Sequence, residues 1–196
     1  MAGSRTAFIH LRESRPGAGM AAAAVMLLRL LPGWGVLTVL LADPDRPETM
    51  PADGRWEITN DRAVLLAAGA EYAGYYAAGA ARVLRVRAQG RYLIVALQNA
   101  QRALAELPGA LVMANLACPE LHPALTVMVS GAIGEEWDEA SREVRDSVDL
   151  TIVNCPGAVE QPIVDDLIPC AFVDCAAAGA EWPLLRAWLR AKFAAR

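Results

Sequence analysis

The chain has 196 residues, 55% of them hydrophobic, and a net charge of −4 at pH 7. That length and apolarity are enough for one domain whose core needs no disulfide or structural metal. The acidic balance provides no broad basic field for phosphate backbones, which argues against nucleic acid as a partner. All basic residues except Lys192 are arginine, so almost the whole chain lacks the residue that nucleotide-binding loops use most.

Short apolar segments alternate with helical patterns along the chain, which predicts an α/β domain with a mostly parallel sheet of about seven strands. Leucine and β-branched residues dominate the short segments, as is typical of strands buried on both faces. The predicted strands are 7–11, 36–41, 82–86, 110–113, 125–129, 150–153 and 170–173. The predicted helices are 19–31, 61–79, 91–107, 137–147 and 182–192. No linker or shift in composition interrupts this pattern, so residues 1–196 are expected to form a single domain.

The first predicted strand leads into a segment with the architecture of an anion-binding loop. Pro16-Gly17-Ala18-Gly19 precedes a helix that begins with small residues. Backbone N–H groups and the positive end of the helix would therefore face a ligand above the sheet. A complete Walker A motif, G-x-x-x-x-G-K-[ST], requires glycine, lysine and Ser/Thr where this chain has Ser14, Met20 and Ala21. The loop is expected to keep the shape of the motif without its cation.

Two arginines next to this loop are candidates to replace the missing lysine. Arg12 and Arg15 flank the end of the first predicted strand, and a guanidinium group can bind phosphate oxygens through two parallel hydrogen bonds. Together with the backbone of Gly17, Ala18 and Gly19, they form the predicted nucleotide or anion site. The alternative is that both arginines are ordinary solvated loop residues.

The segment 20–42 is long and apolar enough to suggest a membrane span. Arg29 and the Pro32-Gly33 pair lie in its middle. An arginine at the bilayer centre costs at least about 2.5 kcal/mol, and Pro-Gly is common in turns. A helix, a turn and a buried strand therefore fit better than a span. The first twenty residues also lack the apolar region of a secretory signal, so a cytoplasmic location is expected.

The longest predicted loop is 43–60, which contains three prolines and several charges. Asp43 and Asp45 follow the second predicted strand, at the sheet edge where α/β proteins place ligands. Asp43 is therefore a candidate Mg²⁺ ligand, although a turn around Pro44 explains this pair of carboxylates equally well. The four cysteines and two histidines show no zinc-site spacing.

Five segments in a fixed order carry a resemblance to a known class of proteins. They are 6–42, 72–83 with its alanine-glycine-alanine turn, 110–115, 125–129 and 148–154. Their order resembles the SIMIBI class of P-loop proteins, which includes the MinD/ParA ATPases and the metal- and cofactor-delivery GTPases. The small accessory proteins of molybdopterin-guanine-dinucleotide biosynthesis look most similar. The resemblance implies a three-layer P-loop-NTPase-like domain that dimerises across its loop face.

The chain departs from that class at the positions that carry its chemistry. The strand corresponding to 110–113 ends in an acidic residue in such proteins, whereas this chain continues with Ala114 and Asn115. Where a GTPase has asparagine, lysine and aspartate to bind guanine, this chain keeps only Asn154. Nucleotide hydrolysis depends on neutralisation of charge by lysine and a metal ion. The resemblance therefore implies the fold more than the activity.

Four aromatic residues suggest a contact surface. Trp56 lies in the long loop, and Tyr72, Tyr75 and Tyr76 lie on the following predicted helix, with Tyr72 on the same helical face as the other two. Aromatic residues are enriched at protein interfaces. Packing of a helix against a sheet also uses them, so both interpretations stay open.

Together these features predict a non-hydrolysing accessory protein of P-loop fold, with no catalytic residue and no cofactor. It would bind a partner protein in the assembly, maturation or regulation of a larger complex. The alternative hypothesis is a divergent accessory enzyme for molybdenum or other metallo-cofactor maturation, which uses ATP or GTP with Mg²⁺ and has Arg15 in place of lysine. Small-molecule binding at the same sheet edge without hydrolysis is a third hypothesis.

Overall fold

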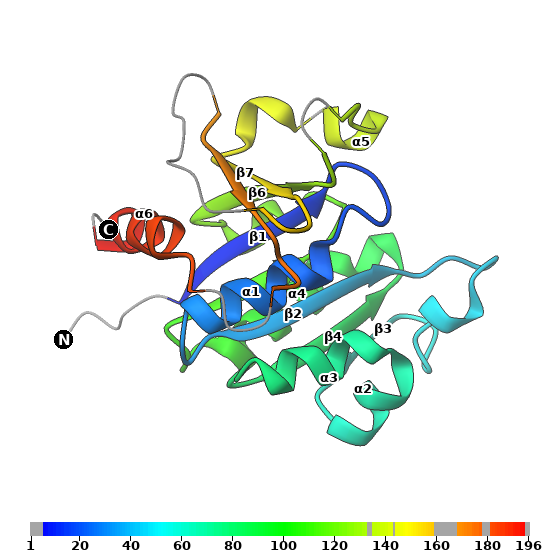
Figure 1. The fold of residues 1–196 in the computed structure, drawn as a ribbon. Coiled ribbons are helices and arrows are strands. Elements are labelled where there is room, and N and C mark those ends of the chain that lie inside the picture. The colour runs from blue at the N-terminus through cyan, green and yellow to red at the C-terminus, as the bar shows by residue number, and fades with distance from the viewer. Residues whose placement is uncertain (1–5, 133–134, 143, 159–167, 178–180, 195–196) are drawn as a thin grey trace.

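An eight-stranded, mostly parallel sheet runs through the protein (Figure 1). The computed structural model describes residues 6–132, 135–142, 144–158, 168–177 and 181–194. The strands are β1 (Ala7–Glu13), β2 (Gly35–Leu41), β3 (Trp56–Thr59), β4 (Val83–Ala88), β5 (Gly109–Met113), β6 (Leu125–Ser130), β7 (Leu150–Asn154) and β8 (Cys170–Val173). Their order in the sheet is β3-β4-β2-β5-β1-β6-β7-β8. Only the pairing of β3 with β4 is antiparallel, so the predicted α/β class with a mostly parallel sheet is confirmed.

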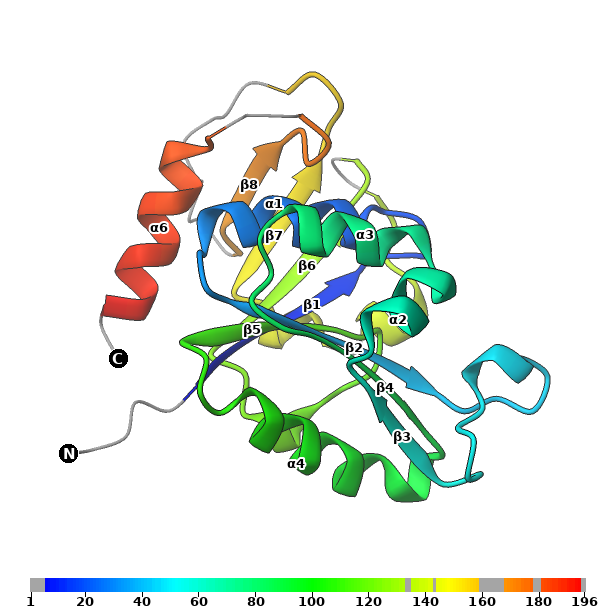
Figure 2. The ribbon, with the colours of Figure 1, turned by 90° about the horizontal axis from the view of Figure 1, so that it is seen from below.

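Helices cover both faces of this sheet. They are α1 (Met20–Leu30), α2 (Arg62–Ala68), α3 (Ala70–Ala77), α4 (Leu93–Leu104), α5 (Glu139–Arg142) and α6 (Pro183–Ala194). Short 3₁₀ turns are η1 (Pro47–Thr49), η2 (Gly90–Tyr92), η3 (Pro119–Leu121) and η4 (Arg145–Ser147). Figure 2 shows α1 and α3 on one side of the sheet and α4 on the other.

Successive side chains of a strand point to opposite faces of the sheet, which divides the core into two layers. On β1, Ile9 and Leu11 pack with residues of α1, α3 and α6, whereas Phe8 packs with residues of α4. The same alternation separates Leu111 from Val112 on β5. A parallel sheet is stable in water when both faces are covered in this way, which accounts for the apolar strand segments in the sequence.

Strand β3 lies inside the segment 43–60 that was predicted to be a loop. It has four residues and pairs at the sheet edge with β4, where Glu57 lies opposite Arg87. Their side chains form an ion pair with 2.7 Å between Oε2 and Nη2. The sequence gives little sign of this strand, because it is short and its polar residues find their partners on a distant strand.

The predicted helix 61–79 is two helices. Asp61 caps α2 by accepting hydrogen bonds from the backbone N–H groups of Ala63 and Val64, at 2.8 and 3.2 Å. The helix ends at Gly69, which has an extended backbone, and α3 begins directly after it. Glycine is a poor helix former, so the break falls at the weakest position of the pattern.

Two further helical predictions have different outcomes. Within the predicted helix 137–147, α5 covers only Glu139–Arg142, η4 covers Arg145–Ser147, and residue 143 lies outside the described residues. Segment 20–42 folds as α1, a turn at Pro32 and Gly33, and strand β2, as predicted. No helix in the described part of the chain is long and apolar enough to cross a membrane.

Candidate functional site

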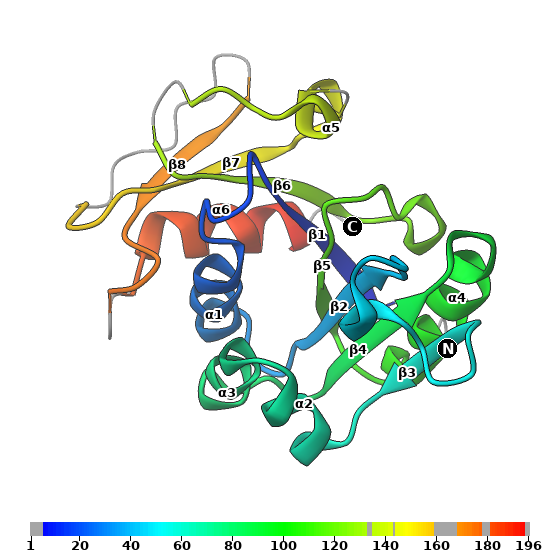
Figure 3. The same cartoon turned by 90° about the vertical axis from the view of Figure 1, so that its right-hand side faces the viewer.

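The connections that follow β1 and β6 leave the sheet in opposite directions. These strands are parallel neighbours, with Leu11 opposite Val127. The chain after β1 enters α1 on one face, and the chain after β6 leads to α5 on the other face (Figure 3). Such a divergence opens a crevice at the carboxyl ends of the strands, which is where α/β sheets bind ligands. The candidate site therefore lies between the β1–α1 loop (residues 14–19) and the residues that follow β6.

The β1–α1 loop is held to the sheet by the backbone of Ser14. Its N–H group donates to the carbonyl oxygen of Val129 at 2.8 Å, and its own carbonyl accepts from the N–H group of Asp138 at 2.8 Å. The loop then turns through Gly17 and Gly19, with φ angles of 87° and 108°. These values lie in the left-handed region that glycine adopts without steric cost, so the two glycines give the loop its shape.

The first turn of α1 points its N–H groups out of the helix. The earliest hydrogen bond of the helical type runs from Ala23 N–H to the carbonyl of Gly19 at 2.9 Å. No side chain of the described residues caps this end of the helix. The strand, loop and helix of the predicted anion site are thus present, and anion binding by Gly17, Ala18 and Gly19 stays a prediction.

The structure does not place Arg12, the first of the two candidate cations, in this loop. Strand β1 continues to Glu13, so Arg12 is a strand residue. Because side chains alternate along a strand, Arg12 points away from the face on which Leu11 packs with α1. Its side chain is buried, and its Nη2 atom donates to the carbonyl of Asn115 at 2.8 Å. Arg12 therefore supports the end of β5 and does not face the loop.

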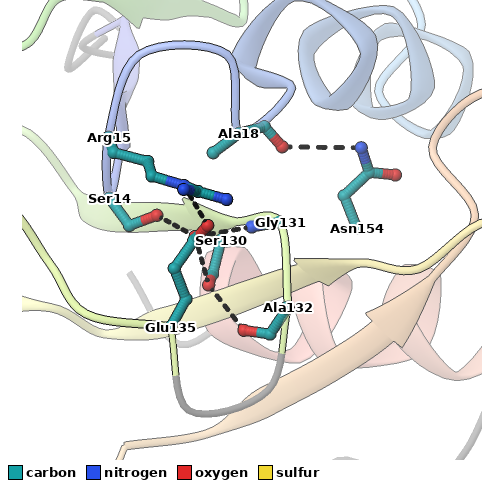
Figure 4. Close-up of polar contacts among 8 residues, drawn as sticks. All are labelled: Ser14, Arg15, Ala18, Ser130, Gly131, Ala132, Glu135 and Asn154. Carbon is teal, nitrogen blue, oxygen red and sulfur yellow. Dashed lines mark hydrogen bonds and ion pairs between the residues drawn. The ribbon is translucent and has the colours of Figure 1, made fainter.

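Arg15 does lie in the loop, and it forms an ion pair with Glu135 (Figure 4). Its Nε atom contacts Oε1 of the carboxylate. The Arg15 side chain is 63% exposed, whereas the Glu135 side chain is only 5% exposed. The candidate substitute for the Walker lysine is thus bound to an acid of the same chain.

Glu135 is held by three further donors at the ends of β1 and β6. Its Oε2 atom accepts hydrogen bonds from Ser14 Oγ at 2.5 Å, Ser130 Oγ at 2.9 Å and Gly131 N–H at 2.8 Å. Burial raises the pKa of Glu135, but these hydrogen bonds and the charge of Arg15 together lower it by more, to about 2. Glu135 is therefore a fixed negative charge beside the loop at neutral pH.

Asn154, the last residue of β7, links the β1–α1 loop to the residues that follow β8. Its Nδ2 atom donates to the carbonyl of Ala18 at 3.5 Å, and its Oδ1 atom accepts from Cys175 N–H at 3.1 Å. A Cβ atom at Gly19 would lie 2.5 Å from Asn154 Nδ2. Both ends of the amide predicted to bind a base thus have partners within the chain, and Gly19 leaves the room that this contact needs.

Asp43 lies apart from this site and belongs to a turn. Its carboxylate accepts from Asp45 N–H at 3.0 Å, and its own N–H donates to Thr49 Oγ1 at 2.8 Å. Strand β5 separates β2 from β1, which puts the two strand ends about 10 Å apart. Among the described residues, no group of three or more His, Cys, Asp or Glu side chains could hold a metal ion. The turn interpretation of Asp43 accounts for these contacts.

Two of the four aromatic residues proposed for a contact surface lie in the core. Tyr72 and Tyr75 are 3% and 0% exposed and meet edge to face in the core, with ring centroids 5.8 Å apart. Tyr76 is half-buried, with the Arg62 guanidinium 4.8 Å from its ring centroid. Trp56 packs against the core layer of α4, on the other face of the sheet. Packing of α3 against the sheet explains Tyr72 and Tyr75, which are too buried to contact a partner.

The residues that build the site were missed in the sequence. Ser14 directly follows β1, Ser130 ends β6, and Glu135 follows five residues later. The available signal was the polar residue at the end of each strand, because these ends meet at one edge of a parallel sheet. No family model, curated protein or solved structure matches the chain. The proposals below therefore depend on the geometry of the site.

Proposed function

We propose that this chain is a non-hydrolysing accessory protein on a P-loop-like scaffold, which binds a partner protein in the assembly, maturation or regulation of a larger complex. The observation that carries the proposal is the contact between Arg15 and the buried carboxylate of Glu135. Arg15 is the candidate cation in the β1–α1 loop, and its charge is already balanced within the protein.

The electrostatics of the loop support this proposal. A nucleoside triphosphate would bring several negative charges close to the ionised Glu135. Two unit charges about 5 Å apart interact by roughly 3 kcal/mol at an effective dielectric constant of about 20. The end of a helix offsets only about 0.3–1 kcal/mol. Because the charges of Arg15 and Glu135 balance each other, and Met20 and Ala21 stand at the lysine and hydroxyl positions, the loop offers a phosphate little net attraction beyond that of the helix.

Exposed apolar side chains at the same edge of the sheet support contact with another protein. Leu41 at the end of β2 is 41% exposed, and Ile94 and Val95 in the first turn of α4 are 50% and 44% exposed. Strand β4 pairs with β2 and leads into α4, so these side chains belong to one edge. Neighbouring exposed apolar residues mark contact surfaces more often than isolated ones do.

Phosphate release tests the non-hydrolysing part of the proposal. The purified chain is incubated with millimolar ATP or GTP and Mg²⁺, and inorganic phosphate is measured against buffer and against Arg15→Ala. We expect all three rates to agree, because the loop lacks the charges that phosphoryl transfer requires. Release well above the buffer rate that disappears in Arg15→Ala would instead support the accessory-enzyme hypothesis.

Partner binding is tested with a surface variant. Ile94→Asp/Val95→Asp places two charges on the proposed contact surface, and Glu106→Gln serves as a control elsewhere on the chain. We expect a protein captured from extracts of the native cells by the wild type and the control, and lost by the double variant. Equal capture by all three would argue against this surface.

A further inference from the structure

A second feature lies over the other half of the sheet and shares Ser130 and Glu135 with the candidate site. It is a cleft of about 590 Å³ between β6–β8 and the residues around α5. Thr151 and Val153 on β7 and Cys170 and Phe172 on β8 line its floor. Ile152, which lies between the two β7 residues, packs in the core layer on the opposite face. The cleft is therefore on the face turned away from α1 and α6 (Figure 3).

The floor of the cleft is apolar and only partly covered. Phe172 and Cys170 are half-buried, although the strands of a mostly parallel sheet are usually covered on both faces. Helix α4 provides this cover for β2, β4 and β5. Above β6–β8, the described part of the chain places only the four-residue helix α5 and the turn η4 beside the cleft. An apolar body bound here would take the place that a longer helix fills elsewhere.

The wall of the cleft carries two arginines beside an indole ring. Arg142 uses Nε to donate to the carbonyl of Trp137 at 2.8 Å, which leaves its two terminal nitrogens as further donors. Arg145 lies over the Trp137 ring, 5.9 Å from the centroid. Among the described residues, neither guanidinium forms an ion pair. Glu135 and Glu136 also line the cleft; Arg15 balances the charge of Glu135, so Glu136 offsets only part of the charge of the two arginines.

The wall is fixed in place by bonds to the end of β1. Besides the Glu135 contact with Ser14, the N–H group of Asp138 donates to the carbonyl of Ser14 at 2.8 Å. Ser141 Oγ donates to the carbonyl of Glu13 at 3.0 Å. These bonds hold the backbone of the wall up to Ser141, so this part of it needs little ordering when a ligand binds.

We infer that this cleft binds a small aromatic oxyanion. The oxyanion would be held by Arg142 and Arg145, and the flat apolar body would rest on Val153 and Phe172. A volume of about 590 Å³ suits a small molecule. Guanidinium groups bind carboxylates and phosphates by charge-assisted hydrogen bonds and stack on flat rings. An aromatic carboxylate and an aromatic phosphate ester share the required chemistry.

The probe is 8-anilinonaphthalene-1-sulfonate, which joins an anionic group to an aromatic body. We expect its fluorescence to rise saturably on titration with the full chain. 2-Naphthoate or 2-naphthyl phosphate displaces it, and the stronger of the two identifies the preferred anion. The neutral 2-naphthalenemethanol displaces it at least about tenfold less well, because it makes no charge-assisted hydrogen bond. Equal displacement by the neutral compound would overturn the inference.

Two variants separate the anion site from the apolar floor. Arg142→Gln/Arg145→Gln weakens binding of the probe at least about tenfold, while Arg190→Gln on α6 leaves it unchanged. Val153→Phe fills the floor, keeps both arginines and also reduces binding. Circular dichroism spectra and melting curves matching those of the wild type identify variants that fold. Wild-type affinity in the folded arginine variant, or in the folded Val153→Phe variant, would contradict the inference.

Discussion

Glu135 balances the charge of Arg15 in the β1–α1 loop. Its carboxylate accepts three hydrogen bonds and contacts Arg15 while its side chain is only 5% exposed. A buried charge is tolerated when it is compensated, here by three hydrogen bonds to Oε2 and by Arg15 against Oε1. The same contacts bring together residues from the β1–α1 loop, β6 and the chain that follows β6.

Replacement of this carboxylate by an amide is expected to destabilise the protein. Glu135→Gln keeps the shape of the side chain but removes the charge that Arg15 and the hydroxyl donors bind. Hydrogen bonds to a charged group are worth about 1.5–3 kcal/mol, so we expect the free energy of unfolding to fall by about 2 kcal/mol in urea titrations. Glu136→Gln, at the exposed neighbour, should change it by less than about 0.5 kcal/mol. Equal values for the two variants would contradict the structural role of Glu135.

The low pKa of Glu135 predicts how this stabilisation depends on pH. The pKa falls from its usual value of 4.5 to about 2 in the folded protein, so the folded state binds this proton more weakly than the unfolded state. The contribution is therefore complete above about pH 5 and is lost as the pH falls toward 2. We expect the difference in unfolding free energy between wild type and Glu135→Gln to shrink between pH 6 and pH 3. A difference that stays constant over this interval would argue against an ionised Glu135.

At the scale of elements, the entry into α1 combines backbone conformation with close packing. Gly17 and Gly19 both have positive φ angles. A Cβ atom at Gly17 would meet nothing within 4 Å, whereas one at Gly19 would lie 2.5 Å from Asn154 Nδ2. A substitution at Gly17 therefore measures the cost of the left-handed conformation alone. A substitution at Gly19 adds the cost of a lost contact between the loop and β7.

A double-mutant cycle measures this difference. Gly17→Ala should cost about 1–2 kcal/mol from conformation alone, and Gly19→Ala should cost at least about 1 kcal/mol more because Asn154 must move. When Asn154→Ala is already present, the cost of Gly19→Ala should fall toward that of Gly17→Ala. Urea unfolding of the wild type and the four variants gives these values. An unchanged cost of Gly19→Ala in the Asn154→Ala background would exclude the contact as its cause.

For the whole molecule, the sheet could be predicted from the sequence because its strands are short, apolar and separated by turns or helices. Strand β3 escaped prediction because Glu57 is polar and its partner Arg87 lies on another strand. Gly69 ended a helix that the apolar pattern alone would have continued. The strand depends on a contact between distant segments, whereas the helix boundary depends on the glycine itself.

The site was predicted less well than the fold, for a related reason. Strand β1 was expected to end at residue 11, but it continues to Glu13. Those two residues move Arg12 from a loop to a strand, and alternation then turns its side chain away from α1. Glu135 follows Ser14 by more than a hundred residues, and only the sheet order brings them together. Local patterns contain no information on that order.

Calorimetric titration of the nucleotide-free protein with ATP and GTP, with and without Mg²⁺ and up to millimolar concentrations, tests the central claim most directly. Because Glu135 holds the charge of Arg15 and no lysine or hydroxyl completes the loop, the account predicts no saturable heat of binding for either nucleotide. Saturable, Mg²⁺-dependent binding that is lost in Arg15→Ala would contradict it.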